Sequence, residues 1–261
     1  MNIIESFENS KFKLAVSLKQ NKFRKKHKKF LVEGLRNVEL AISNDNIVSY
    51  IFIDELKIKE SKYYKINDSL ENKVHIISSK LMESLSDTIT CQGIVAICNM
   101  KSYTIEDIEL EDDILILDKI QDPGNLGTIL RTADSSGIKN IICIKGTTDI
   151  YSQKVVRSSM GSLMYLKIIF IDDYLSLNFL KNNRYLLMAS SLDEAIDYKI
   201  INTIKSKIAL ILGNEANGID TKLLDKADLK VKIPIYGAAE SLNVAIAGGI
   251  LMYKLKERKL S

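Results

Sequence analysis

Three glycine-containing loops hold most of the residues that could do chemistry in this sequence. They cover residues 121–127, 213–218 and 234–243, and each is expected at the end of a strand. They offer backbone amides with Asn, Ser and Glu side chains, and Arg131 follows the first loop. Because ligands of open α/β sheets bind beyond the carboxyl ends of the strands, these loops predict one shared site. This set of groups suits an adenosine-type cofactor and the positioning of a hydroxyl.

Other common site chemistries lack the residues they need. Residues 213–218 have the glycine spacing of a phosphate-binding loop, but Ile-Asp follows where Lys and Ser or Thr are required. The glycines of residues 124–127 lack the third partner of a dinucleotide fingerprint. The only histidines, His27 and His75, lie far from the loops, which disfavours Ser-His-Asp hydrolysis. No cluster has metal-ligand spacing, so we expect no metal.

Positive charge is concentrated at the start of the chain. Residues 1–30 contain eight Lys, one Arg and two Glu, a net +7, whereas the whole chain carries +4. Such a cluster attracts the phosphates of nucleic acids, although a solvated, partly disordered arm would have the same composition. The candidate RNA-binding residues are Lys22, Arg24, Lys25, Lys26, Lys28 and Lys29.

Composition sets the class of protein. The chain has 261 residues, of which 46% are hydrophobic, so it can form one large or two ordinary cores. No apolar run is long enough for a membrane span, and the first residues lack the features of a secretory signal. The three cysteines form no C-x-x-C pair, which disfavours a disulfide scaffold or a zinc site. We expect a soluble cytoplasmic protein.

Apolar runs and helical periodicity predict two α/β units. We expect strands at residues 30–32, 50–53, 74–77, 93–97, 114–117, 141–144, 168–171, 185–188 and 208–212, and helices at 35–42, 79–85, 126–136 and 242–256. The continuous runs after residue 113 are typical of a parallel sheet covered on both faces. The expected domains are residues 1–100 and 113–261, joined by an acidic linker at 101–112.

The three loops resemble the signature motifs of the SpoU (TrmH-type) RNA 2′-O-ribose methyltransferases of the SPOUT superfamily. The motifs are residues 122–133 (DPGNLGTILRTA), 212–218 (LGNEANG) and 233–245 (IPIYGAAESLNVA). Residues 30–34 (FLVEG) and 90–96 (TCQGIVA) are similar to phrases of the substrate-binding domain that precedes this catalytic domain. All motifs occur in the family's order.

The resemblance implies a fold and a reaction. It implies a small ribosomal-protein-like α/β domain, then a SPOUT α/β domain with a parallel sheet and a deep trefoil knot. It further implies S-adenosylmethionine as cofactor and a homodimer formed through the knotted domain. The implied reaction is methyl transfer to a ribose 2′-hydroxyl, in 23S ribosomal RNA rather than tRNA, because stand-alone tRNA enzymes of the group often lack the first domain.

The resemblance also assigns roles to residues. The implied catalytic residues are Arg131, Asn125, Glu215, Ser241 and Asn243, and the implied cofactor-binding residues are Gly213, Asn214, Gly218, Ile233, Pro234 and Leu242. Arg131 is expected to hold the target phosphate or polarise the hydroxyl, because its high pKa makes it a poor base. Glu215 is expected to support Arg131 or to order the cofactor loop.

Alternatives remain for these assignments. Asn125 could serve only as a helix cap, and Ser241 or Asn243 could cap the last helix. At the level of function, the alternatives are a tRNA 2′-O-methyltransferase and a non-catalytic RNA-binding or ribosome-assembly factor on the same scaffold.

Overall fold

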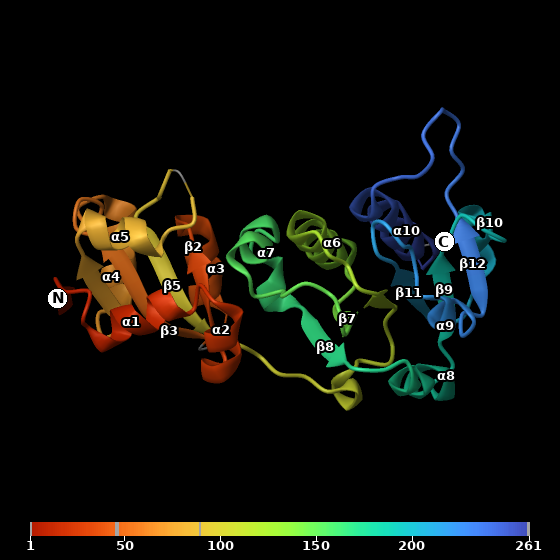
Figure 1. The fold of residues 1–261 in the computed structure, drawn as a ribbon, viewed down its shortest axis with the longest axis horizontal. Coiled ribbons are helices and arrows are strands. Elements are labelled where there is room, and N and C mark those ends of the chain that lie inside the picture. The colour runs from red at the N-terminus through yellow and green to blue at the C-terminus, as the bar shows by residue number, and fades with distance from the viewer. Residues whose placement is uncertain (1, 45–46, 89, 260–261) are drawn as a thin grey trace. The chain divides into compact units, whose positions relative to one another are not determined.

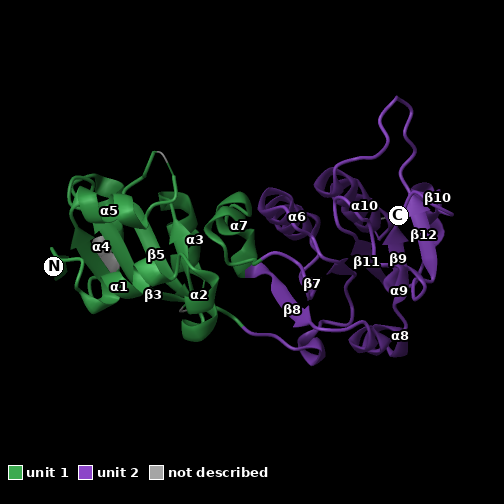
Figure 2. Cartoon of the chain, viewed as in Figure 1, with its two compact units in different colours: residues 1–101, 149–164 green, residues 102–148, 165–261 purple. Residues whose placement is uncertain are grey.

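The computed structural model describes residues 2–44, 47–88 and 90–259, and they form two compact units. Unit 1 contains residues 1–101 and 149–164, and unit 2 contains residues 102–148 and 165–261 (Figure 2). The domain limits expected from the sequence remain a prediction. The units add that residues 149–164 pack with the first part of the chain, and that nearly all of the expected linker belongs to unit 2.

Unit 1 is built around a five-stranded mixed sheet (Figure 1). Its strands are β1 (Asn2–Ile4), β2 (Lys29–Glu33), β3 (Val48–Asp54), β4 (Val74–Ile77) and β5 (Ile94–Asn99). Its helices are α1 (Ser10–Ser17), α2 (Asn21–His27), α3 (Leu35–Ser43), α4 (Ser61–Ser69), α5 (Ser79–Leu85) and α7 (Gln153–Ser158). The order is β1-β4-β3-β5-β2, with β5 antiparallel to both of its neighbours.

Unit 2 contains a seven-stranded parallel sheet. Its strands are β6 (Ile114–Leu117), β7 (Asn140–Ile144), β8 (Lys167–Ile171), β9 (Leu186–Ser190), β10 (Ile196–Asp197), β11 (Ile208–Leu212) and β12 (Leu229–Lys232). Its α-helices are α6 (Pro123–Ser136), α8 (Asn178–Asn182), α9 (Thr221–Leu224) and α10 (Val244–Arg258). Short 3-10 helices are η1 (Ile105–Asp107), η2 (Ser162–Tyr165, which crosses the boundary between the units), η3 (Leu175–Leu177) and η4 (Tyr198–Thr203).

The order of this sheet is β10-β12-β9-β11-β6-β7-β8. Strands β6, β7 and β11 are buried along their whole length, as their continuous apolar runs predict. The expected α/β fold is therefore confirmed, whereas the trefoil knot remains a prediction. Within the described residues, no helix combines the length and the apolar character needed to cross a bilayer.

Helices α6 and α10 pack together beside the centre of this sheet. Gly248 lets α10 approach β11 closely, because a Cβ atom there would lie 2.6 Å from Cδ1 of Leu212. At the end of α10, the buried Arg258 guanidinium donates a 2.6 Å hydrogen bond to the buried Asp113 carboxylate next to β6. The last helix is thus held both along its length and at its end.

Candidate active site

The carboxyl ends of β6 and β11 are neighbours, with Leu212 opposite Leu117. The chain continues from β6 to β7 and β8 on one side, while β9 and β12 lie on the other. The loops after β6 and β11 therefore meet at a topological switch point, where open α/β sheets bind their ligands. The loop between β12 and α10 reaches well beyond the sheet (Figure 1).

The first loop enters α6 through an Asp-Pro pair. Asp122 is the N-cap and accepts a 2.8 Å hydrogen bond from the backbone N–H of Asn125, while Pro123 occupies the first turn. Asn125 is therefore not the cap, and the alternative that assigned it capping alone is wrong. Its side chain points elsewhere, because both of its polar atoms bond to the other two loops.

Glu215 ties the second loop to the first. Its Oε1 accepts hydrogen bonds from the Asp122 backbone N–H and from Asn125 Nδ2, both at 3.1 Å, and Oε2 accepts from the Gln121 backbone N–H at 3.1 Å. Burial by itself would raise the pKa of this carboxyl, but the hydrogen bonds, led by that of Asn125, outweigh burial and lower the pKa. Glu215 is therefore ionised at neutral pH.

Asn243 ties the third loop to the first. It is the N-cap of α10, and its Oδ1 accepts from the backbone N–H of Ala245 at 2.9 Å. Its Nδ2 donates a 3.0 Å hydrogen bond to Oδ1 of Asn125. The capping role expected for Asn243 or Ser241 thus falls to Asn243. A continuous chain of side-chain hydrogen bonds joins Glu215, Asn125 and Asn243, one from each motif.

The second loop closes on itself and leaves no space at its first glycine. The Asn214 and Gly218 backbones bond to each other at 2.8 and 3.0 Å, and Gly218 has a φ of +68°. A Cβ atom on Gly213 would lie 2.4 Å from backbone atoms of Gly218 and Ile219. The Asn214 side chain bonds to Lys119 O and to two backbone N–H groups of its own loop, so it shapes the loop.

A cavity of about 680 Å³ lies among these loops. Its lining includes nine of the expected site residues: Asn125, Gly213, Asn214, Glu215, Gly218, Ile233, Ser241, Leu242 and Asn243. Pro234 is absent from this lining, although both of its neighbours, Ile233 and Ile235, belong to it. Residues 190–193, at the end of β9 and directly after it, also line the cavity and were not among the predicted site residues. The same strand-end rule that singled out the three loops could have found them.

Arg131 lies outside the cavity lining. It is exposed on α6, and its side chain forms no hydrogen bond or ion pair with the described residues. Of the two roles expected for Glu215, the geometry therefore favours ordering the cofactor loop, since its bonds go to Gln121, Asp122 and Asn125.

The basic cluster of unit 1 lies on α2 and at the start of β2. Lys22, Lys25, Lys26 and Lys28 are exposed. Lys29 is half-buried and donates to Ser49 Oγ at 2.5 Å, and burial lowers the pKa of its ammonium. Arg24 is only 5% exposed, and its N–H groups bond inside unit 1, which corrects the expectation that it contacts RNA directly.

The chain is similar in sequence to families of known RNA methyltransferases and their substrate-binding domains. Residues 112–253 match the SpoU rRNA Methylase family, and residues 9–96 match the MRM3-like substrate binding domain. The 23S rRNA (guanosine(2553)-2'-O)-methyltransferase RlmP of Bacillus subtilis (strain 168) is 35% identical, over 98% of this chain and 100% of the relative.

Solved structures of RNA methyltransferases are similar to this chain in fold. The AdoMet-bound rRNA methyltransferase from Sinorhizobium meliloti has a TM-score of 0.88 and 28% identity, with 99% of each chain covered. The A. aeolicus TrmH/SpoU tRNA modifying enzyme, with a TM-score of 0.50 and 26% identity, covers 57% of this chain and 76% of its own. The expected methyltransferase activity, RNA substrate and S-adenosylmethionine cofactor are thereby confirmed. The chain belongs to the SpoU rRNA Methylase family.

Proposed function

We propose that this protein transfers a methyl group from S-adenosylmethionine to a ribose 2′-hydroxyl of 23S ribosomal RNA. The observation that carries the proposal is the hydrogen-bonded chain of Glu215, Asn125 and Asn243, which joins the three motifs beside one cavity. The RlmP relative, similar over nearly the whole length of both chains, supports the same reaction and substrate.

The cavity suits the cofactor in size and charge. Its volume of about 680 Å³ is within the usual range for sites of small organic ligands. Three carboxylates and one ammonium line it, from Asp193, Glu215, Glu240 and Lys232, and this acidic balance favours a cationic ligand. When bound, S-adenosylmethionine supplies an electrophilic methyl group on a positively charged sulfur. The backbones of Ile233 and Leu242 and the closed loop at Gly213 would hold it.

The RNA side of the site depends on Asn125, Ser241, Asn243 and Arg131. The first three line the cavity and can orient a ribose hydroxyl by hydrogen bonding. Arg131 is exposed further along α6 and can hold an RNA phosphate or polarise the hydroxyl. Because a guanidinium keeps its protons at neutral pH, Arg131 orients the nucleophile and does not take the hydroxyl proton.

The first domain favours ribosomal RNA over tRNA as the substrate. It matches a substrate-binding domain, whereas the similarity to the A. aeolicus tRNA modifying enzyme covers 57% of this chain. The exposed lysines of α2 would supply phosphate contacts for the RNA.

We also propose a homodimer through unit 2, the domain that is predicted to contain the knot. Ile246, Ile250 and Tyr253 are 55%, 37% and 49% exposed on α10. Their spacing of four and three residues places them on one side of the helix, which gives a second copy an apolar surface to cover.

We propose the cytoplasm as the location of the protein. Its proposed substrate, ribosomal RNA, is found there, and the free thiols of Cys91, Cys98 and Cys143 are typical of a reducing compartment.

Mapping of 2′-O-methyl groups tests the function directly. Total RNA from cells with and without the gene is compared nucleotide by nucleotide. We expect one 2′-O-methyl group to disappear from 23S rRNA and to return with the wild-type gene but not with an Arg131→Ala copy. Loss of a tRNA methyl group instead would establish the tRNA alternative, and an unchanged map would contradict the proposal.

A further inference from the structure

Helix α2 is a poor helix by its own sequence. It has seven residues, a Gln20 N-cap without a side-chain hydrogen bond, and no acidic residue in its first turn. Lys22 lies three and four residues before Lys25 and Lys26, so like charges repel each other along one side of the helix. Short helices with like charges are marginal in water, so tertiary contacts must hold α2 in place.

Arg24 supplies those contacts from the opposite side of the helix. Its Nη1 donates 2.8 Å hydrogen bonds to the carbonyl oxygens of Leu18 and Lys19, in the turn that enters α2. Its Nε and Nη2 donate to Oδ2 of Asp149 at 2.9 and 2.5 Å. Only 6% of the Arg24 side chain and 20% of the Asp149 side chain are exposed, so salt screens this pair less than it screens an exposed pair.

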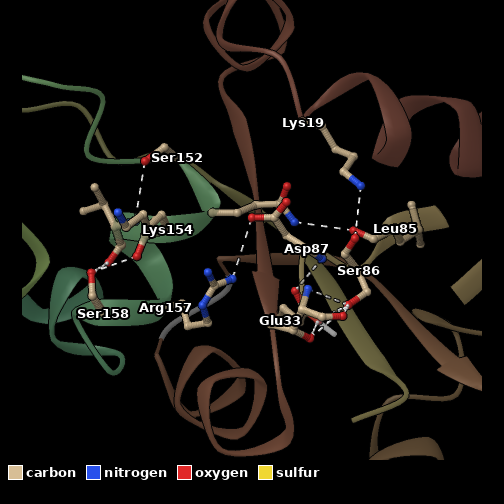
Figure 3. A network of polar contacts seen from close by, with 12 residues as sticks. Lys19, Glu33, Leu85, Ser86, Asp87, Ser152, Lys154, Arg157 and Ser158 are labelled. Carbon is tan, nitrogen blue, oxygen red and sulfur yellow. Dashed lines mark hydrogen bonds and ion pairs between the residues drawn. The ribbon is translucent and has the colours of Figure 1, made fainter. Parts of the chain in front are cut away.

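Asp149 is held in turn by the segment that follows it. Its Oδ1 accepts from the Tyr151 backbone N–H at 2.9 Å. Further along, Gln153 Nε2 donates to Leu85 O at 3.4 Å, and Arg157 lies 3.8 Å from the Asp87 carboxylate. Figure 3 shows α7 facing the 85–87 turn across these polar contacts. The backbone of Asp87 is in turn bonded to Glu33, which anchors the turn to β2.

We propose that Asp149, through Arg24, is a positioning residue for RNA binding: the largely buried ion pair holds α2 so that its lysines present one ordered surface to the phosphates. The inference rests on the proposed function, in which these lysines contact RNA. Asp149 lies inside the stretch that matches the methylase family, whereas α2 lies inside the match to the substrate-binding domain. A residue of one sequence region thus orders the binding helix of the other.

The positioning role and simple electrostatics predict opposite signs for Asp149→Asn. This substitution removes a negative charge near a basic surface, which by long-range attraction alone strengthens RNA binding. If the pair orders α2, the same substitution weakens binding, because the lysines no longer share one geometry. Glu8→Gln is the matched control, since Glu8 is an exposed acid of unit 1 that does not contact Arg24.

The experiment measures binding of a 23S rRNA fragment to the full chain at several salt concentrations, with methylation kinetics. For Asp149→Asn we expect a five- to tenfold higher Kd and KM, an unchanged kcat and an unchanged cofactor Kd. Amide exchange should quicken in residues 20–29 and not in the rest of unit 1. For Glu8→Gln we expect equal or slightly tighter binding.

Two further variants complete the test. Arg24→Lys keeps the charge but loses the pair of hydrogen bonds to Asp149, so it should also weaken RNA binding. If Asp149→Asn unfolds unit 1, the RNA affinity of Arg24→Lys tests the positioning role in its place. Replacement of Lys22, Lys25, Lys26 and Lys28 by Gln tests the underlying assignment. If the lysine variant binds RNA as the wild type does, the lysines do not contact RNA, and both this assignment and the positioning role of Asp149 are overturned. If the lysine variant binds more weakly but Asp149→Asn and Arg24→Lys bind as the wild type does, only the positioning role is overturned.

Discussion

The cavity of unit 2 and the basic helix of unit 1 are built on different physical principles. At the cavity, one carboxylate and two amides from three loops that are distant in sequence bond to each other. Each of these side chains holds specific hydrogen bonds that no other residue can replace. On α2, several exposed lysines would each contact phosphate in the same way, and one largely buried ion pair holds their helix in place. A single substitution should therefore reduce activity or affinity strongly at the cavity, and only slightly on the exposed side of α2.

The steepest effect is expected for Arg131→Ala. Removal of a charged group that orients the reacting atoms costs about 10²–10³ in rate. The cofactor Kd should stay within about twofold, because Arg131 does not line the cavity. Single-turnover methylation and cofactor titration measure the two quantities. Full activity would remove Arg131 from the chemistry, and loss of cofactor binding would place it in the cofactor site.

Gly213→Ala should weaken cofactor binding strongly. The added Cβ would lie 2.4 Å from the backbone of Gly218 and Ile219, so the loop must shift. Overpacking of this kind costs about 1–3 kcal/mol, or roughly 5- to 150-fold in affinity. The matched control is Gly237→Ala, where a Cβ meets no atom within 4 Å. Equal cofactor affinity of both variants, measured by calorimetry, would contradict the proposed loop geometry.

Glu215→Gln should weaken cofactor binding about tenfold, since the amide loses an ionised acceptor facing three N–H donors. The pKa of Glu215 is lowered in the fold. The stabilisation that the ionised Glu215 gives to the folded loops is therefore complete above the usual carboxyl pKa of about 4.3. It is lost as the pH falls through the lowered pKa of Glu215. The difference between wild type and variant should be constant from about pH 6 to 9. A difference that vanishes at neutral pH would show that Glu215 is protonated there.

Lys25→Gln should have the smallest effect. Loss of one phosphate contact lowers the salt-dependence slope of RNA binding by about 0.7–0.9 and the affinity a few-fold. Lys80→Gln on α5 is the control, because it removes an exposed charge of the same unit away from α2. Equal slopes in wild type and both variants would show that α2 lysines do not contact the RNA individually.

The sequence predicted the sheet of unit 2 better than its site geometry. Continuous apolar runs identified β6, β7, β8 and β11 within one residue, whereas the charged β12 carries no such signal. The true cap of α6 was readable from the Asp-Pro pair at residues 122–123.

The decisive contacts could not be read from local patterns. Asn125 meets residues 90 and 118 positions away, and Arg24 meets one 125 positions away. Those separations depend on strand order and on the packing of α7, neither of which leaves a periodic signal in the chain. The motifs named the residues of the site but not which of them bond to each other.

The most direct test is transfer of a labelled methyl group from S-adenosylmethionine to unmodified 23S rRNA, followed by nuclease digestion and analysis of the nucleosides. We predict label in one 2′-O-methylnucleoside with the wild-type protein, and a rate of labelling about 10²–10³ lower with Arg131→Ala. Label on a base, or no label from a protein that binds both cofactor and RNA, would contradict this prediction.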